Sequence, residues 1–142
     1  MGLNNELSTK QIAEIEIEVK QTALSHLNAK DATTALSNYT EDATIASNGF
    51  LYPSRQAFSE DIKAFYGSLD RIDLAEWEEI RINVISKNAA TFNAKFRWVS
   101  TDTSGQKTNF QGIWSALFVR DNECWKIKMR HESFIHLKEP SD

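Results

Sequence analysis

Hydrophobic residues in the first part of the chain recur with the period of an α-helix. From Ile12 to Leu27 they are spaced three or four residues apart, which places them on one helical face. Ser8 and Gln11, just before this run, match the capping box that begins many helices. The pattern therefore predicts a first helix that starts after Ser8 and runs to about Asn28.

Two more helices and a short strand are expected next. Asp31 can cap a short second helix, and Ser54 can cap a third helix that ends near Gly67. Between them, residues 41–47 are expected to form a short strand. Residues 48–53 contain glycine and proline, so we expect a connector there.

The second half of the chain alternates between hydrophobic and polar residues with a period of two, which is typical of β-strands. Four such runs extend over about residues 71–86, 89–101, 107–120 and 123–137. A turn around Gly105 joins the second run to the third. The cross-strand pairs that result are Trp98 with Phe110 and Phe96 with Gly112.

The register between the first two runs has two solutions. A two-residue turn at Lys87–Asn88 would put Trp77 and Arg81 on the inner face. A bulge would instead put aliphatic residues there, namely Ile80, Ile82 and Val84. We prefer the bulge because it buries the aliphatic side chains.

The last two runs form a hairpin in which one histidine is expected to face inward. Asp121–Asn122 is a two-residue turn signal, and the register that follows from it places Gly112 opposite His131. Alternation puts His131 on the apolar face of the last run, which comprises Trp125, Ile127, Met129, His131 and Ser133. Because glycine has no side chain, the imidazole of His131 would have free space beside it.

Helices come first in the chain and an antiparallel meander comes last, which is typical of an α+β fold. We expect a single domain over residues 8–137, with loose ends at residues 1–7 and 138–142. Three N-terminal helices would cover the concave face of a curved, mostly antiparallel sheet. The inner face of this sheet is rich in aromatic residues, which either fill the interior or line a pocket.

Composition narrows the possible partners and locations. The chain has 142 residues and a net charge of -4, which disfavours a nucleic-acid partner. No apolar run reaches membrane-spanning length, and the N-terminus lacks a signal-peptide pattern. We therefore expect no membrane partner and a cytoplasmic location. The single cysteine, Cys124, cannot form an intrachain disulfide.

No metal or cofactor is expected. The three histidines, His26, His131 and His136, lack the spacing of a known set of metal ligands, and we expect His26 and His136 to be exposed. The chain contains no phosphate-binding loop and no dinucleotide-binding fingerprint.

Two segments carry a family resemblance. They are HLNAKDATTALSNYTEDATIASNG, with its acidic-Asp-Ala step, and GIWSALFVRDNECWKIKMRHESF, with its Trp-Lys-Ile and His-x-Ser pattern. The chain resembles the nuclear transport factor 2-like superfamily over residues 8–136, and more closely its SnoaL-like branch. The resemblance implies a cone-shaped, usually dimeric domain with a pocket between the helices and the concave sheet. Members include isomerases, cyclases, epoxide hydrolases and dehydratases, as well as non-catalytic ligand-binding or assembly domains.

The catalytic groups of the family can be compared one by one with this chain. Ser47 stands near the position of the aspartate base in steroid-isomerase-like members, and Ala23 near that of their helix-1 tyrosine. The Asp-Arg-Asp set of epoxide-hydrolase-like members is also missing. Arg97 is expected on the outer face, and we expect no carboxylate on the inner faces of the last three strands. Both reactions are therefore disfavoured. His131 is the remaining candidate, because the ordinary pKa of histidine suits proton transfer near neutral pH.

We predict a small-molecule-binding domain with an aromatic-lined pocket in which His131 is the polar anchor. The expected ligand is a small apolar or aromatic molecule, with or without a carboxylate. Two alternatives stay open: an isomerase, cyclase or lyase with His131 as general acid or base, and a non-catalytic dimeric assembly module. The predicted binding residues are Tyr39, Tyr52, Phe58, Ile62, Phe65, Phe96, Trp98, Phe110, Gly112, Trp114 and His131.

The outer face of the sheet is expected to form a homodimer contact. Ile113, Leu117 and Val119 on the third run point away from the helices, together with Val99 on its neighbour. An exposed apolar strip of this kind is typical of an interface between copies of a chain.

Overall fold

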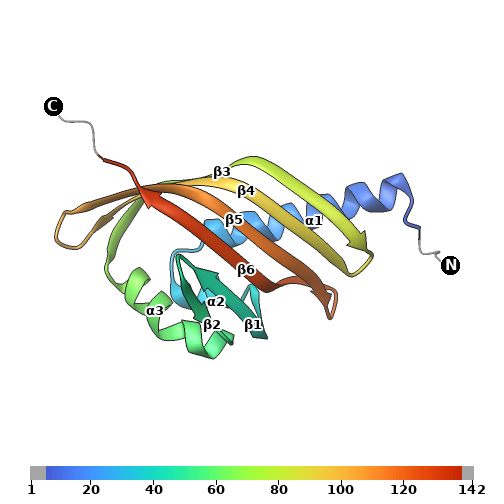
Figure 1. Ribbon diagram of the computed structural model, residues 1–142, viewed down its shortest axis with the longest axis horizontal. Coiled ribbons are helices and arrows are strands. Elements are labelled where there is room, and N and C mark those ends of the chain that lie inside the picture. Colours follow the sequence, from blue (N-terminus) through green and yellow to red (C-terminus); the bar gives the residue numbers. More distant parts are fainter. Residues whose placement is uncertain (1–5, 139–142) are drawn as a thin grey trace.

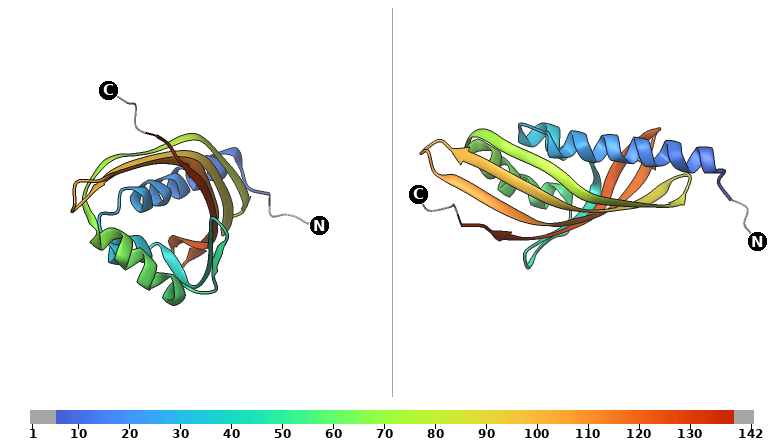
Figure 2. Two further views of the ribbon diagram at one scale, coloured as in Figure 1. Left: turned by 60° about the vertical axis from the view of Figure 1, so that its left-hand side comes forward. Right: turned by 90° about the horizontal axis from the view of Figure 1, so that it is seen from above.

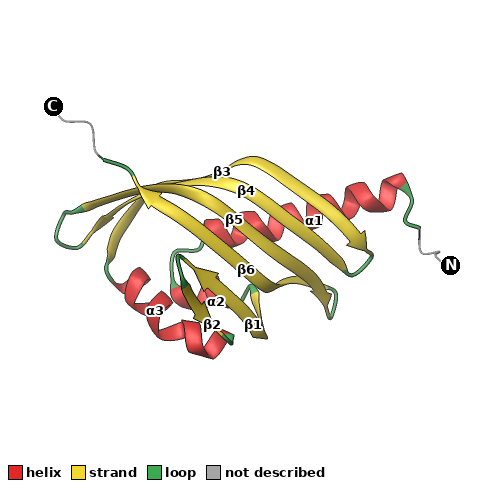
Figure 3. Cartoon of the chain, in the orientation of Figure 1, coloured by secondary structure: helices red, strands yellow, loops and turns green. Residues whose placement is uncertain are grey.

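The computed structural model describes residues 6–138 and shows three helices and a curved six-stranded sheet (Figure 1). The helices are α1 (Thr9–Leu27), α2 (Ala32–Leu36) and α3 (Arg55–Gly67). The strands are β1 (Tyr39–Ser47), β2 (Phe50–Tyr52), β3 (Leu69–Ser86), β4 (Ala89–Asp102), β5 (Lys107–Asp121) and β6 (Cys124–His136). The four long strands follow the helices in the chain, and Figure 3 distinguishes the helices (red) from the strands (yellow).

The strands form one open sheet in the order β2-β1-β6-β5-β4-β3. Within the described part of the chain, β1 and β6 are the only parallel neighbours, and all other pairs are antiparallel. The sheet curves around α1, and α3 lies on the same concave side, beside β1 and β2 (Figure 2). The predicted α+β architecture, with three helices on the concave face of a curved and mostly antiparallel sheet, is confirmed.

The predicted helix starts are also confirmed. Ser8 accepts a hydrogen bond from the backbone N–H of Gln11, and the Gln11 side chain accepts one from the N–H of Ser8, which completes the capping box. Asp31 caps α2 and Ser54 caps α3, each by accepting from the backbone N–H three residues later. Leu7, which we expected in a loose end, packs against the core. Residues 1–5 and 139–142 lie outside the described residues.

The segment expected to be a connector is instead a hairpin. Asn48 and Gly49 form its tight turn, with positive φ angles of 42° and 92°. The chain then returns as β2, which pairs antiparallel with the end of β1, so that Ile45 lies opposite Tyr52. The three residues of β2 are too short a run for an alternating pattern to be recognised in the sequence. No helix within residues 6–138 is both long enough and apolar enough to span a membrane.

Both solutions for the β3–β4 register turn out to be partly correct. The two-residue turn at Lys87–Asn88 is present, because Ser86 pairs with Ala89. A register shift between Val84 and Ser86, next to this turn, provides the predicted bulge, and a second shift follows between Glu78 and Arg81, with Glu79 at a positive φ of 50°. The preference for the bulge is confirmed, since the residues expected to be buried do pack against the core, namely Ile80, Ile82 and Val84. The second shift also brings Trp77 inward, opposite Phe96.

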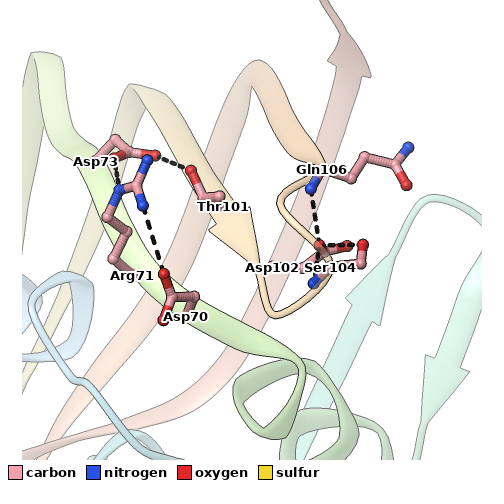
Figure 4. A network of polar contacts seen from close by, with 7 residues as sticks. All are labelled: Asp70, Arg71, Asp73, Thr101, Asp102, Ser104 and Gln106. Atoms are coloured by element: carbon pink, nitrogen blue, oxygen red, sulfur yellow. Dashed lines mark hydrogen bonds and ion pairs between the residues drawn. The ribbon is translucent and has the colours of Figure 1, made fainter.

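The β4–β5 hairpin has the predicted register, with Trp98 opposite Phe110 and Phe96 opposite Gly112. Side-chain hydrogen bonds hold its end (Figure 4). One Asp102 carboxylate oxygen accepts from the backbone N–H groups of Ser104 and Gln106, at 2.9 Å each. Next to it, the Thr101 hydroxyl donates to Asp73 at 2.7 Å and ties β4 to β3. The strands that carry Trp98 and Phe110 are therefore fixed at this end of the sheet.

The predicted β5–β6 register is wrong. The turn lies at Asn122–Glu123, one residue later than expected, and both residues have the positive φ angles of a tight hairpin turn. A register shift then occurs at Lys128, because Phe118 pairs with Ile127 whereas Leu117 pairs with Met129. An extra residue of this kind is a β-bulge, and it reverses which face each later residue occupies.

The interior is solid beside the middle of α1. Val19 and Ala23 on α1 are fully buried against the inner face of the sheet, where Phe92, Phe118 and Ile127 are also fully buried. Burial of each large apolar side chain contributes about 1.5–3 kcal/mol to stability. This packing anchors α1 to the sheet and leaves the space near the C-terminal end of α1 to the candidate site.

Candidate functional site

A cavity of about 450 Å³ lies on the concave side of the sheet, between its inner face, α3 and the β1–β2 hairpin. Ligand pockets in proteins begin at roughly 300 Å³, so the space is large enough for a small molecule. Its walls are mostly aromatic. Nine of the residues predicted to bind a ligand line it, namely Tyr39, Tyr52, Phe58, Ile62, Phe65, Phe96, Trp98, Phe110 and Trp114.

The aromatic rings that line the cavity pack against one another. Trp98 stacks with Phe110, with ring centroids 6.3 Å apart and planes inclined by 10°. Phe65 on α3 approaches Trp98, with centroids 5.6 Å apart. Contacts of this kind hold the wall in shape without a ligand, which favours a preformed pocket.

The other two predicted binding residues lie outside the cavity. His131 is exposed on the opposite face of the sheet, where it pairs with Ser115 on β5 and Ala46 on β1. The prediction that it faces inward is wrong, because the bulge at Lys128 reverses the alternation just before it. His131 therefore cannot be the anchor of this cavity or an acid–base group within it.

Gly112 serves a different purpose from the predicted one. A side chain at this position would place its Cβ 1.9 Å from the Ser133 carbonyl oxygen and 2.7 Å from Phe134 Cα. The glycine therefore allows β5 and β6 to approach each other closely and provides no free space for a ligand.

The bulge brings a charged pair into the cavity in place of His131. Arg130 and Glu132 both line it, and Arg130 Nη1 donates to Glu132 Oε1 at 3.0 Å. The residue Arg130 is only 6% exposed, and its guanidinium lies 5.1 Å from the centre of the Phe58 ring. The Tyr39 and Glu132 side chains next to it raise the pKa of Arg130, against the effect of burial, so it stays charged. Its Nε is buried and has no partner among the described residues.

The expectation that no carboxylate lies on the inner faces of the last strands is therefore also wrong. Glu132 lies opposite Trp114 on β5 and next to Ser47 on β1. The Ser47 hydroxyl donates to the second carboxylate oxygen of Glu132 at 3.1 Å. At the position where the resemblance implies an aspartate base, this chain has a hydroxyl that orients a carboxylate from β6.

A hydrogen-bonded pair of His26 and Tyr39 lies deeper in the cavity. Tyr39 Oη is 3.2 Å from His26 Nε2, and the His26 ring packs 5.5 Å from that of Trp114. Burial, followed by the charge of Arg130, lowers the pKa of His26 to about 3, although the nearby Ala35 backbone opposes this. The imidazole is thus neutral at pH 7. Burial likewise raises the pKa of Tyr39, which stays protonated.

The prediction that His26 is exposed is wrong, and the helical period could have corrected it. Val19 and Ala23 are buried on α1, and His26 follows Ala23 by three residues, so it shares their face. No similar signal exists for Arg130 and Glu132, because the bulge that turns them inward has no local sequence pattern. His136 lies at the rim of the cavity and is exposed, as predicted.

The mouth of the cavity is bridged by Tyr52 on β2 and Asp61 on α3, both of which line it. The Tyr52 hydroxyl donates a short hydrogen bond to Asp61, and this bond is the main reason that the pKa of Tyr52 is raised. Burial raises the pKa of Tyr66, also on α3, to about 12. These phenols therefore stay neutral at pH 7 and serve as hydrogen-bond donors or acceptors.

No protein-family model matches the sequence, and no curated protein does so either. Solved structures, however, are similar. A candidate scytalone dehydratase from Novosphingobium aromaticivorans gives a TM-score of 0.81 at 13% identity, over 92% of this chain and 89% of that one. A candidate dehydratase of the nuclear transport factor 2-like family from Streptomyces avermitilis gives 0.74 at 14% identity, over 87% and 98%. This chain has the nuclear transport factor 2-like fold.

Another structure with the nuclear transport factor 2-like fold is that of a hexachlorocyclohexane dehydrochlorinase. Its TM-score is 0.72 at 11% identity, and the likeness covers 92% of this chain and 94% of that one. At such low identities the comparisons establish the fold alone, since one fold hosts many activities. The resemblance found in the sequence is confirmed at that level.

Proposed function

We propose that this chain is a small-molecule-binding domain whose ligand, a small and largely apolar or aromatic molecule, lies in the cavity with Arg130 as its polar anchor. The observation that carries the proposal is the Nε of Arg130, a buried donor without a partner among the described residues, in an aromatic-walled cavity. A buried polar group without a hydrogen bond costs about 1–3 kcal/mol, so a ligand acceptor placed there would be favoured. His131, the anchor expected from the sequence, is replaced in this role by its neighbour.

Tryptophan fluorescence can test the proposal directly. Trp77, Trp98 and Trp114 line the cavity, so bound aromatic compounds should quench or shift the emission. We expect Arg130→Gln to weaken binding by about 10-fold or more, since a hydrogen bond to a charged group contributes about 1.5–3 kcal/mol.

Two variants serve as controls for this titration. Arg97→Gln removes an arginine from the outer face of the same sheet, where Arg97 donates to Asn109 at 3.2 Å. His131→Ala changes the exposed neighbour of Arg130. Both should bind like the wild type. Equal weakening in all three variants would contradict a specific role for Arg130.

An enzyme of the isomerase, cyclase or lyase type is the second candidate, and one observation favours it. Glu132 is a carboxylate in an apolar cavity, oriented by Ser47 and next to the guanidinium of Arg130. Such a carboxylate can take a proton from the carbon beside a carbonyl group whose oxygen accepts a hydrogen bond from Arg130. Two of the similar structures described above are named as candidate dehydratases and one as a dehydrochlorinase.

The enzyme candidate makes a separate prediction. Glu132→Gln should abolish turnover of any aromatic ketone that the wild type converts, measured by the change in its absorbance, while binding of that ketone continues. His131→Ala should leave turnover unchanged. No turnover by the wild type of any compound that binds would favour the binding domain.

We also propose that the chain forms a homodimer through the outer face of the sheet, as the sequence suggested, either in addition to ligand binding or as an assembly module. Several hydrophobic residues on this face are well exposed, namely Ile113, Met129 and Ile135. An apolar patch of this kind on a sheet face favours association with a second copy. Light scattering at micromolar concentration should give twice the mass of one chain, and Ile113→Lys should reduce the measured mass to that of a single chain. A monomeric wild type would contradict the proposal.

A further inference from the structure

The charges around the cavity carry information about the ligand, provided that the proposed binding function holds. Among the described residues that line the cavity, Arg130 is the only charged side chain with a buried donor that has no partner. Its charge is already paired, because Glu132 lies 3.0 Å away and the two side chains are 7% and 18% exposed. A guanidinium and a carboxylate at this distance form a pair without net charge.

The other titratable groups around the cavity add no positive charge at its centre. The imidazole of His26 is neutral at pH 7, and the hydroxyls of Tyr39 and Tyr66 stay protonated. Asp61 at the mouth accepts a hydrogen bond from the neutral hydroxyl of Tyr52, so this bond does not compensate the negative charge of Asp61. The wall as a whole is therefore neutral near Arg130 and negative at the entrance, and His136 lies at the rim in contact with water.

We propose that the cavity selects an uncharged aromatic molecule that carries a hydrogen-bond acceptor, such as an aryl ketone, over a carboxylate of the same shape. A ketone oxygen can accept from the free Nε of Arg130 while the Arg130–Glu132 pair stays intact. A carboxylate would either lie next to the carboxylate of Glu132 or displace it. Like charges close together in a space of low dielectric repel strongly, and a displaced Glu132 would remain buried without its partner.

Two matched pairs of compounds test this selectivity: acetophenone with benzoate, and 2-acetylnaphthalene with 2-naphthoate. Within each pair the number of heavy atoms is the same, and the methyl group of the ketone is replaced by the charged second oxygen of the carboxylate. Titration at pH 7.5, followed by tryptophan fluorescence, should show that at least one ketone binds about 10-fold or more tightly than its carboxylate, a free-energy difference of about 1.4 kcal/mol.

The variant Glu132→Gln should reverse this preference. The glutamine side chain has the same shape as that of glutamate but leaves the positive charge of Arg130 uncompensated, so the carboxylate should now bind more tightly than the ketone. Glu79→Gln is the matched control, because it removes an exposed carboxylate that pairs with Lys95 at 3.2 Å away from the cavity. This control should keep the wild-type preference. A thermal melt of each variant confirms that it is folded before titration.

The outcomes separate the inference from the proposed function. Tighter binding of the carboxylates by the wild type overturns the selectivity and leaves a binding domain. An unchanged preference in a folded Glu132→Gln variant also overturns it, because Glu132 would then not set the charge of the site. Absence of binding of all four compounds at millimolar concentration overturns both.

Discussion

The two halves of β6 differ in how they relate to the sequence. Before Lys128, Trp125 and Ile127 alternate as expected, and both are buried on the inner face. After Lys128 the inner residues are Arg130 and Glu132, although the apolar pattern favoured their neighbours. One extra residue therefore exchanges a histidine for an ion pair in the candidate site.

The comparison shows that the alternation of inward and outward side chains depends on the local sequence, whereas the register of strand pairing depends on the neighbouring strands. The register of β6 shifts relative to β5 at Lys128, and its register relative to β1 shifts at the same place, between the pairs Tyr39–Ile127 and Thr44–Met129. The charged residues after the bulge can be buried because their opposite charges pair with each other. A pattern of hydrophobicity cannot anticipate this, since it assigns every charged residue to the solvent.

The largest expected effect is a difference in stability between substitutions at the two neighbours Arg130 and His131. Arg130→Met leaves Glu132 buried without its partner, and removal of one member of a buried ion pair costs about 3–5 kcal/mol of unfolding free energy. His131→Ala changes an exposed residue and should cost less than about 0.5 kcal/mol. Urea unfolding of both variants measures the difference. Similar losses for the two variants would contradict the register of β6 after the bulge.

Deletion of single residues tests the bulge itself. Without Lys128, the strand can continue with regular alternation and keep Arg130 inside, so the fold should tolerate the loss. Without Lys126, Ile127 has to leave the core and Lys128 takes its place, which should cost about 2–5 kcal/mol more. Urea midpoints of the two deletion variants provide the measurement. Equal destabilisation would mean that Lys128 is not the extra residue.

The pH dependence of stability should reveal the largely buried imidazole of His26 in the cavity. His26 titrates near 6.5 in the unfolded chain but near 3 in the native protein, so below pH 6.5 the unfolded state binds a proton that the native state does not. The contribution of His26 is therefore present above pH 6.5 and is lost as the pH falls toward 3. Between pH 7 and pH 4 the two pKa values limit this loss to about 3 kcal/mol, and the partial exposure of the residue reduces it further.

His26→Gln is the matched variant for this measurement. It should lose less stability than the wild type when urea unfolding is repeated at pH 7, 6, 5 and 4, because glutamine does not titrate. Aspartates with lowered pKa values, such as Asp73 and Asp102, contribute equally to both proteins. Parallel curves for the two proteins would contradict a buried neutral His26.

The smallest expected effect concerns Ser47, which lies opposite the second half of β6. Ser47→Ala removes the hydrogen bond to Glu132 and should cost about 1 kcal/mol. Ser115→Ala is a suitable control, because it removes a hydroxyl that donates to Asn93, outside the cavity, at 2.6 Å. The two should differ in the binding of aromatic ketones, which Ser47→Ala weakens and Ser115→Ala leaves unchanged. Identical binding would show that Ser47 does not position Glu132.

Much of the fold could be predicted from the sequence, because its signals are local. The helix caps at Ser8, Asp31 and Ser54, and the β4–β5 register around Gly105, each depend on a few neighbouring residues. The nine cavity residues were predicted because large apolar side chains on one face of a strand or helix must turn inward. The polar groups of the cavity could not be found in this way. His26 was missed although the helical period indicates it, and Arg130 and Glu132 had no local signal.

The sequence by itself determined the order of helices and strands, the buried face of α1 and the aromatic wall of the cavity. Burial of apolar surface is a large and additive term, so these features survive errors of one residue in a turn. Only the tertiary structure decided which of two adjacent residues, Arg130 or His131, faces the cavity. That choice depends on the hydrogen bonds of β6 to two neighbouring strands, one of them more than 80 residues away in the chain. It also depends on the presence of an opposite charge beside Arg130, which makes its burial possible.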